Sequence, residues 1–130
     1  MACIEALQIE EKWRAKTSTV LDLEEISPTD MKRLLKETYE LLLKFHKEEL
    51  VPKEVTKVLL EMDAFLYFVS LMERKEVGID FYKYQRIFSI VEALKAGFFS
   101  GDYECEFPKL KLDKGEKKIS VIDFESDIFA

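Results

Sequence analysis

The sequence predicts an α+β fold, in which a three-helix antiparallel core is followed by a C-terminal β-hairpin. Apolar residues recur at helical spacing through residues 27–98. Through residues 102–126 they instead alternate with polar residues, as they do in half-buried strands. Because the chain has 130 residues, 48% of them hydrophobic, we expect residues 1–130 to form a single domain around one core.

The first predicted helix begins after Ser27. The Ser27 hydroxyl can cap the first turn, Pro28 suits the first helical position, and Asp30 places a negative charge where a helix favours one. The helix should end between Phe45 and Leu50, because Pro52 disfavours helical backbone in the residue before it. Its core face consists of Met31, Leu34, Leu35, Thr38, Leu41, Leu42 and Phe45.

The second predicted helix, residues 52–76, has two apolar faces. The larger face consists of Val55, Val58, Leu59, Met62, Phe65, Leu66, Val69 and Met72. The smaller face, on nearly the opposite side, consists of Leu60, Ala64, Tyr67, Phe68 and Leu71. A helix that is apolar on two sides is either central in its own domain or shared with another chain.

The third predicted helix begins near Asp80, whose carboxylate can cap it, and ends at Gly97, a residue type common just after helices. Its single apolar face consists of Phe81, Tyr84, Ile87, Phe88, Val91, Leu94 and Phe98. This pattern completes the helical core over residues 27–98.

Residues 1–26 fit two alternatives. Ile4, Leu7 and Trp13 have a loose helical spacing, whereas the β-branched residues in the segment 17–23 favour a strand. In the second alternative, this segment adds strands to a small sheet that packs on the helices.

The predicted hairpin turns at residues 113–116, where Gly115 can take the positive φ that tight turns need. Pairing the two ends of this turn sets Leu110 opposite Ile119 on an apolar face. The same register sets Phe107 opposite Ile122 and Cys105 opposite Phe124.

Composition and motifs exclude several classes of protein. With 20 Lys and Arg against 26 Asp and Glu, the net charge of −6 excludes binding of nucleic acid by bulk positive charge. The four glycines form no phosphate-binding loop, and the single histidine, His46, has no nucleophile at a known motif spacing. Cys3 and Cys105 lack the spacing of a zinc site, so we expect no metal and no cofactor.

The composition of the chain also predicts its location in the cell. We expect a cytoplasmic protein that does not enter the membrane, because no apolar stretch has the length of a membrane span and no signal peptide is evident. The chain has no Asn and only two Gln, a composition that favours a heat-adapted source.

These observations predict a small acidic, non-enzymatic interaction module, such as an adaptor, antitoxin or immunity protein, that binds a protein partner or itself. The expected contact surface is the smaller apolar face of the second helix: Leu60, Ala64, Tyr67, Phe68 and Leu71. An acidic patch on one face of the hairpin would suit a basic partner. It consists of Glu104, Glu106, Asp123 and Glu125.

Two alternatives come from other classes of protein. The four hairpin carboxylates could hold a divalent cation, which would make the chain a metal-dependent hydrolase. Tyr82, Lys83 and Arg86 on the third helix combine an aromatic ring with cations, as in proteins that contact RNA or DNA, although nucleic acid is not the partner we expect.

Overall fold

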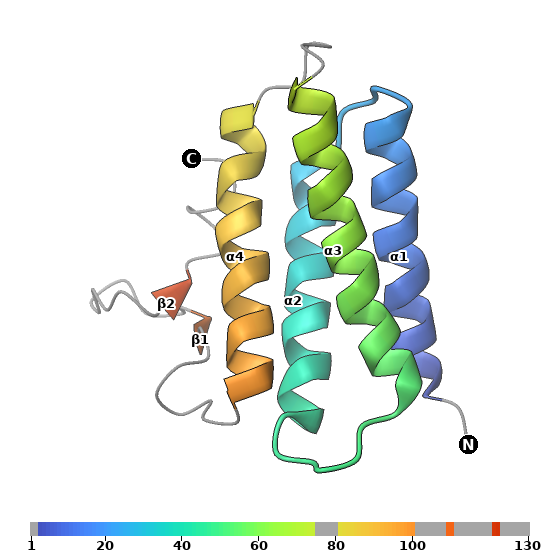
Figure 1. Cartoon of the computed structure of the whole chain (residues 1–130), viewed down its shortest axis with the longest axis vertical. Coiled ribbons are helices and arrows are strands. Elements are labelled where there is room, and N and C mark those ends of the chain that lie inside the picture. Colours follow the sequence, from blue (N-terminus) through green and yellow to red (C-terminus); the bar gives the residue numbers. More distant parts are fainter. Residues whose placement is uncertain (1–2, 75–80, 101–108, 111–120, 123–130) are drawn as a thin grey trace.

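A computed structural model describes residues 3–74, 81–100, 109–110 and 121–122 of the chain. Its described part contains four α-helices, which run alternately up and down (Figure 1). In chain order these helices are α1 (Ile4–Leu21), α2 (Pro28–Phe45), α3 (Lys53–Arg74) and α4 (Phe81–Ser100). Helices α1 and α4 each pack against both α2 and α3, and the most extensive of these contacts joins α1 to α3.

The start of α2 confirms the cap predicted from the sequence. The Asp30 backbone N–H donates a hydrogen bond of 3.4 Å to Ser27 Oγ, and Pro28 lies in the first turn. The helix ends at Phe45, inside the predicted interval. Residues 46–52 then cross the end of the bundle to α3 (Figure 1).

Of the two alternatives for the N-terminal segment, the helix is correct. The β-branched residues that favoured a strand fit α1 because Thr17 Oγ1 donates to Trp13 O and Thr19 Oγ1 donates to Ala15 O, at 3.2 and 3.0 Å. Bonds of this kind satisfy a threonine hydroxyl within a helix. Trp13, Thr17 and Val20 also share one buried face of α1.

The end of α1 has a backbone conformation that glycine usually adopts. Leu23 has a φ of +59°, in the left-handed region. The Leu23 N–H donates to Val20 O and the Glu24 N–H donates to Thr19 O, so the two bonds satisfy carbonyls that the helix end leaves free. A leucine therefore ends the helix where the sequence contains no glycine.

The predicted end of the third helix at Gly97 is three residues short. Gly97 is buried within α4, which continues to Ser100. A glycine inside a helix weakens it by only about 1 kcal/mol, which packing against the bundle can offset. The start of α4 at Phe81 agrees with the prediction.

The predicted α+β class is wrong. Within the described residues the only strands are β1 (Lys109–Leu110) and β2 (Val121–Ile122), which are two residues long and pair in parallel. A hairpin requires antiparallel strands, and the predicted pairing of Leu110 with Ile119 is replaced by Leu110 with Ile122. Among the described residues, the N-terminal segment packs on the core as helix α1 and not as strands added to a sheet.

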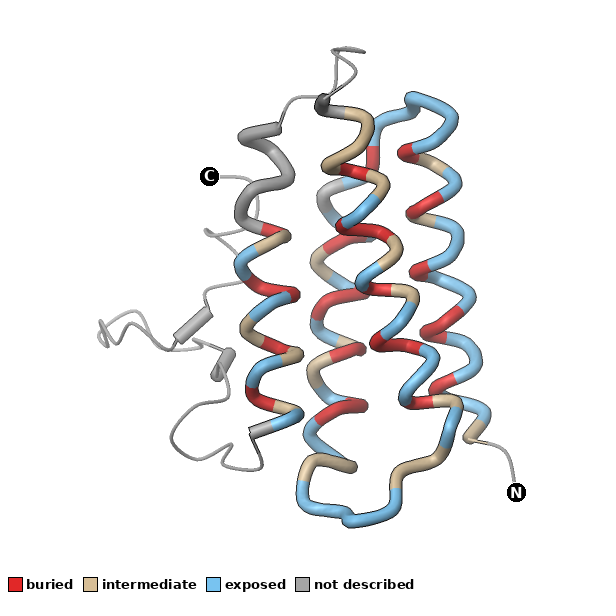
Figure 2. The backbone as a smooth tube through the Cα atoms, in the orientation of Figure 1, coloured by how far each residue is buried: buried red, intermediate tan, exposed pale blue. Residues whose placement is uncertain are grey.

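The core lies between the four helices, and the buried residues of α1 face α3 in Figure 2. Trp13 is fully buried at its centre. Its ring meets Phe65 edge to face, with ring centroids 5.5 Å apart, and its indole N–H donates to Thr38 Oγ1. One side chain of α1 therefore contacts both α2 and α3.

Candidate protein-binding surface

The five apolar residues that the sequence places on the second face of α3 lie away from the core. Leu60 is 61% exposed and Tyr67 is 55% exposed, whereas Ala64, Phe68 and Leu71 are half-buried. We call these five residues the outer stripe. The inner face of the same helix is buried throughout the core: Val55, Val58, Leu59, Met62, Phe65, Leu66 and Val69.

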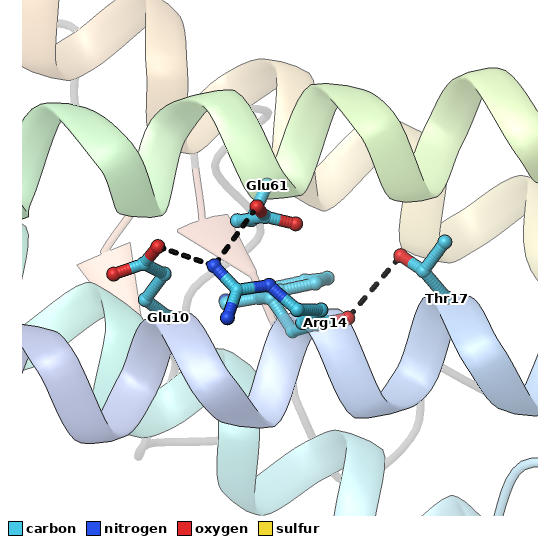
Figure 3. Close-up of polar contacts among 5 residues, drawn as sticks. Glu10, Arg14, Thr17 and Glu61 are labelled. Carbon is cyan, nitrogen blue, oxygen red and sulfur yellow. Dashed lines mark hydrogen bonds and ion pairs between the residues drawn. The ribbon is translucent and has the colours of Figure 1, made fainter.

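The position of α3 between two neighbours explains why the outer stripe stays uncovered. Glu61 faces α1, where its Oε1 lies 3.4 Å from Arg14 Nη2 (Figure 3). Asp63 faces α4, where its Oδ1 pairs with Lys95 Nζ. Residues two apart on a helix point about 200° apart, so these ion pairs mark the two flanks of α3. The outer stripe lies between the flanks, on the side away from the core.

Figure 3 shows a charge cluster where α1 meets α3. The Arg14 guanidinium also contacts Glu10 Oε1 at 2.6 Å, and the Glu10 side chain is only 9% exposed. A buried carboxylate requires such a partner, because an unpaired buried charge is strongly unfavourable. The single positive charge of Arg14 is thus shared between Glu10 and Glu61, with the shorter contact to the buried Glu10.

On the α4 side, Lys95 is held by two carboxylates. Burial by itself would lower the pKa of Lys95, but the hydrogen bond to Asp63 and the charges of Asp63 and Glu92 outweigh it and raise the pKa above its ordinary value. Glu92 Oε1 lies 3.5 Å from Lys95 Nζ. The Asp63 charge is therefore neutralised within the protein.

Two aromatic rings form the centre of the outer stripe. Tyr67 and Phe68 stack with ring centroids 5.3 Å apart and an angle of 7° between the ring planes. Stacked aromatic rings offer a large, flat apolar area whose side chains are already ordered. Tyrosine is also one of the residue types enriched in protein interfaces.

Two lysines that sequence reasoning missed extend the outer stripe toward the start of α3. Lys53 and Lys57 are exposed, and neither forms an ion pair with another described residue. The spacing gives a signal for them, because residues 53, 57, 60, 64, 67 and 71 alternate steps of four and three along one helix face. This face therefore joins an apolar stretch to two free positive charges.

Other exposed apolar side chains lie near the two ends of the bundle. Leu50 is 90% exposed in the connection from α2 to α3, and Phe99 is 70% exposed at the end of α4. Ile4, Leu7, Leu21, Leu23 and Leu43 are further examples. Ile4 and Leu7 lie three residues apart at the start of α1, and Leu21 lies at its other end. No helix face joins as many of these residues as the outer stripe joins on α3.

A hollow of about 190 Å³ lies between α1 and α2. It is lined by Lys12, Ala15, Lys16, Asp30, Arg33, Leu34 and Glu37. Lys12 Nζ lies 2.7 Å from Glu37 Oε2, and Lys16 Nζ lies 3.9 Å from Asp30 Oδ2. Both lysines of its lining are therefore next to carboxylates, and the lining contains no serine, cysteine or histidine.

The remaining predicted sites are not brought together by the described residues. Glu104, Glu106, Asp123 and Glu125 lie outside these residues, as does most of the predicted hairpin. Tyr82, Lys83 and Arg86 belong to the first turns of α4, where only the backbone is described. Within residues 3–74 and the other described segments, no group of three or more His, Cys, Asp or Glu could hold a metal ion.

Comparison with known proteins adds no family to this picture. No protein-family model, no curated protein and no solved structure matches the chain. Among the described helices, none combines the length and the apolar character needed to cross a membrane.

Proposed function

We propose that the protein is a protein-binding module and that the outer stripe of α3 is its contact surface. One observation carries the proposal: Leu60 and Tyr67 are more than half exposed on a helix whose inner face is already filled by the core. Covering a large apolar side chain contributes roughly 1.5–3 kcal/mol when burial is complete. A partner that covers the outer stripe therefore gains affinity without unfolding any part of the bundle.

The proposal includes the non-enzymatic and cytoplasmic character expected from the sequence. The apolar face favours a protein partner over a small ligand, because it lies along one outward helix face and not in an enclosed cavity. The hydrolase and nucleic-acid alternatives depend on side chains outside the described part of the chain, and we propose neither.

Photo-crosslinking inside the source cell tests this function. We would place p-benzoylphenylalanine at Tyr67 and, separately, at Leu60, with Ser18 as the control because Ser18 is exposed on α1. We expect adducts to the same protein, identified by mass spectrometry, from Tyr67 and Leu60 but not from Ser18. Equal labelling from Ser18, or no adduct from either α3 position, would contradict the proposal.

A substitution provides a second test that does not depend on the crosslinker. Tyr67→Lys places a charge in the outer stripe without touching the core, since Tyr67 is more than half exposed. With the photoreactive residue kept at Leu60, this change should remove the adduct while circular dichroism and the melting temperature stay unchanged. If the adduct persists in a folded variant, the contact surface does not include Tyr67 and the proposal is contradicted.

A further inference from the structure

The outer stripe has the spacing that packs against another helix. Leu60, Ala64, Tyr67 and Leu71 follow one another at steps of four, three and four residues. Steps that alternate between three and four keep side chains on one line along a helix, and a second helix inserts its own side chains between them. An extended strand instead presents every second residue, a spacing that this surface does not match.

A small residue between larger ones gives the surface a shape suited to this packing. Ala64 lies one turn from Leu60 and one turn from Phe68. Because its side chain is smaller than theirs, the surface has a shallow depression, or low point, at Ala64. Ala64 is half-buried, whereas Leu60 is 61% exposed and stands above it. One large apolar side chain of a partner helix can fill this low point.

The charged residues on this face of α3 indicate which charge a partner should carry. The acidic residues on both flanks, Glu61 and Asp63, are paired with Arg14 and Lys95. Lys53 and Lys57 have no such partner among the described residues, although the whole chain has a net charge of −6. The start of α3 adds the positive end of the helix dipole. Glu54 lies beside the two lysines in the first turn, but positions 53, 57, 60, 64, 67 and 71 of this face carry no charge other than Lys53 and Lys57, which favours an acidic partner.

We propose that the outer stripe binds an acidic amphipathic α-helix of another protein, with carboxylates of that helix beside Lys53 and Lys57. This inference rests on the proposed function and adds the chemistry of the partner. From Lys53 to Leu71 the face extends about 27 Å, so a partner helix of about 18 residues can cover it. In a parallel pair of α3 helices a second copy of this chain would set lysines against lysines, and a dimer in any other arrangement is an outcome of the test below.

Designed peptides test the inference with the full chain. One fluorescent 21-residue amphipathic helical peptide has leucines at steps of three and four and two glutamates at one end; a second has lysines in place of those glutamates. We expect the acidic peptide to bind about tenfold more tightly at low salt, since two exposed ion pairs replace two repulsions. Fluorescence anisotropy measures both affinities. Equal affinities, or no binding of either peptide, would overturn the inference.

Charge reversal on the protein provides the matched experiment. Lys53→Glu combined with Lys57→Glu should reverse the order of the two affinities. Arg33→Glu combined with Lys36→Glu changes the net charge equally on exposed positions of α2 and should leave the order unchanged. An acidic preference that survives the α3 variant, or disappears in the α2 variant, would contradict the assigned contact. Circular dichroism verifies that both variants fold.

The two proposals fail in different ways. Suppose that crosslinks from Tyr67 and Leu60 identify one partner while the acidic peptide shows no preference: the protein-binding function then stands and the acidic-helix inference falls. A dimer of this chain in sedimentation that is lost in Leu60→Ser would also overturn the inference, because the second copy would then occupy the outer stripe. A monomer that prefers the acidic peptide supports both proposals.

Discussion

Trp13 Nε1 of α1 donates a hydrogen bond of 2.9 Å to Thr38 Oγ1 of α2, and both side chains are buried in the core. Thr38 Oγ1 in turn donates to Leu34 O at 2.6 Å. The indole ring meets Phe65 of α3 edge to face. Because the indole N–H has a partner, Trp13 can lie at the centre of the bundle without an unsatisfied donor.

Removing the hydroxyl from this pair should destabilise the bundle. We expect Thr38→Val to lower the free energy of unfolding by about 1–3 kcal/mol, because the buried indole N–H then has no acceptor. Thr38→Ser, which keeps the hydroxyl, should cost less. Urea denaturation followed by tryptophan fluorescence measures both variants. A Thr38→Val variant as stable as the wild type would show that the hydrogen bond does not contribute to stability.

Phe65 and Tyr67, two residues apart on α3, should respond differently to truncation. Phe65→Ala should lower the free energy of unfolding by roughly 3–5 kcal/mol, because Phe65 is fully buried against Trp13. Tyr67→Ala should cost less than about 1 kcal/mol, because Tyr67 is more than half exposed. Thermal unfolding by circular dichroism compares them. A large loss for Tyr67→Ala would mean that the outer stripe is part of the core.

Leu23→Gly should stabilise the protein, although it removes an apolar side chain. At a left-handed φ such as that of Leu23, a residue with a Cβ is less stable than glycine by about 1 kcal/mol. The Leu23 side chain is exposed, so its removal should cost little. The matched control is Leu21→Gly, at the last residue of α1, where the backbone is helical; this change should destabilise by up to about 1 kcal/mol. Chemical denaturation of both variants provides the measurement, and a loss of stability in Leu23→Gly would contradict the assigned helix end.

The ion pair between Lys95 and Asp63 should stabilise the fold up to alkaline pH. The pKa of Lys95 is raised in the folded protein, so its contribution is complete below the unfolded value of about 10.5 and is lost as pH rises through the higher folded pKa. Asp63→Asn should therefore cost up to about 1 kcal/mol at pH 7 to 9 and less above pH 10.5. Chemical denaturation across this pH range measures the difference.

Glu11→Gln is the control for that series. Glu11 is exposed on α1 and forms no ion pair with another described residue. Its effect on stability should not change between pH 9 and pH 11. A difference between wild type and Asp63→Asn that stays constant over this range would show that Lys95 does not depend on Asp63 for its charge.

Local signals in the sequence predicted much of the bundle. Ser27 and Pro28 located the start of α2, because capping depends on residues within one turn. The two apolar faces of α3 were also predicted, and Leu60 and Tyr67 are exposed on the second face. The free lysines beside them were missed, because their pairing depends on which helices lie next to α3.

The failures share a physical cause. The β-branched segment that ends α1 and the glycine at position 97 have weak helical preferences, which burial against other helices overcomes. The predicted sheet failed for the same reason, since the N-terminal segment packs on α2 and α3 as a helix and not as added strands. Local propensity is worth tenths of a kcal/mol per residue, whereas burial of one large side chain is worth several times more.

By itself, the sequence determined the positions of α2 and α3 and the apolar composition of the outer stripe, because each follows from spacing along the chain. Only the tertiary structure decided that α1 joins the core as a helix and that α3 lies between α1 and α4. That arrangement pairs Glu61 with Arg14 and Asp63 with Lys95. These pairs join residues more than thirty positions apart. The exposure of the outer stripe and the pairing of its two flanks are therefore products of packing, whereas its residue types follow from local sequence.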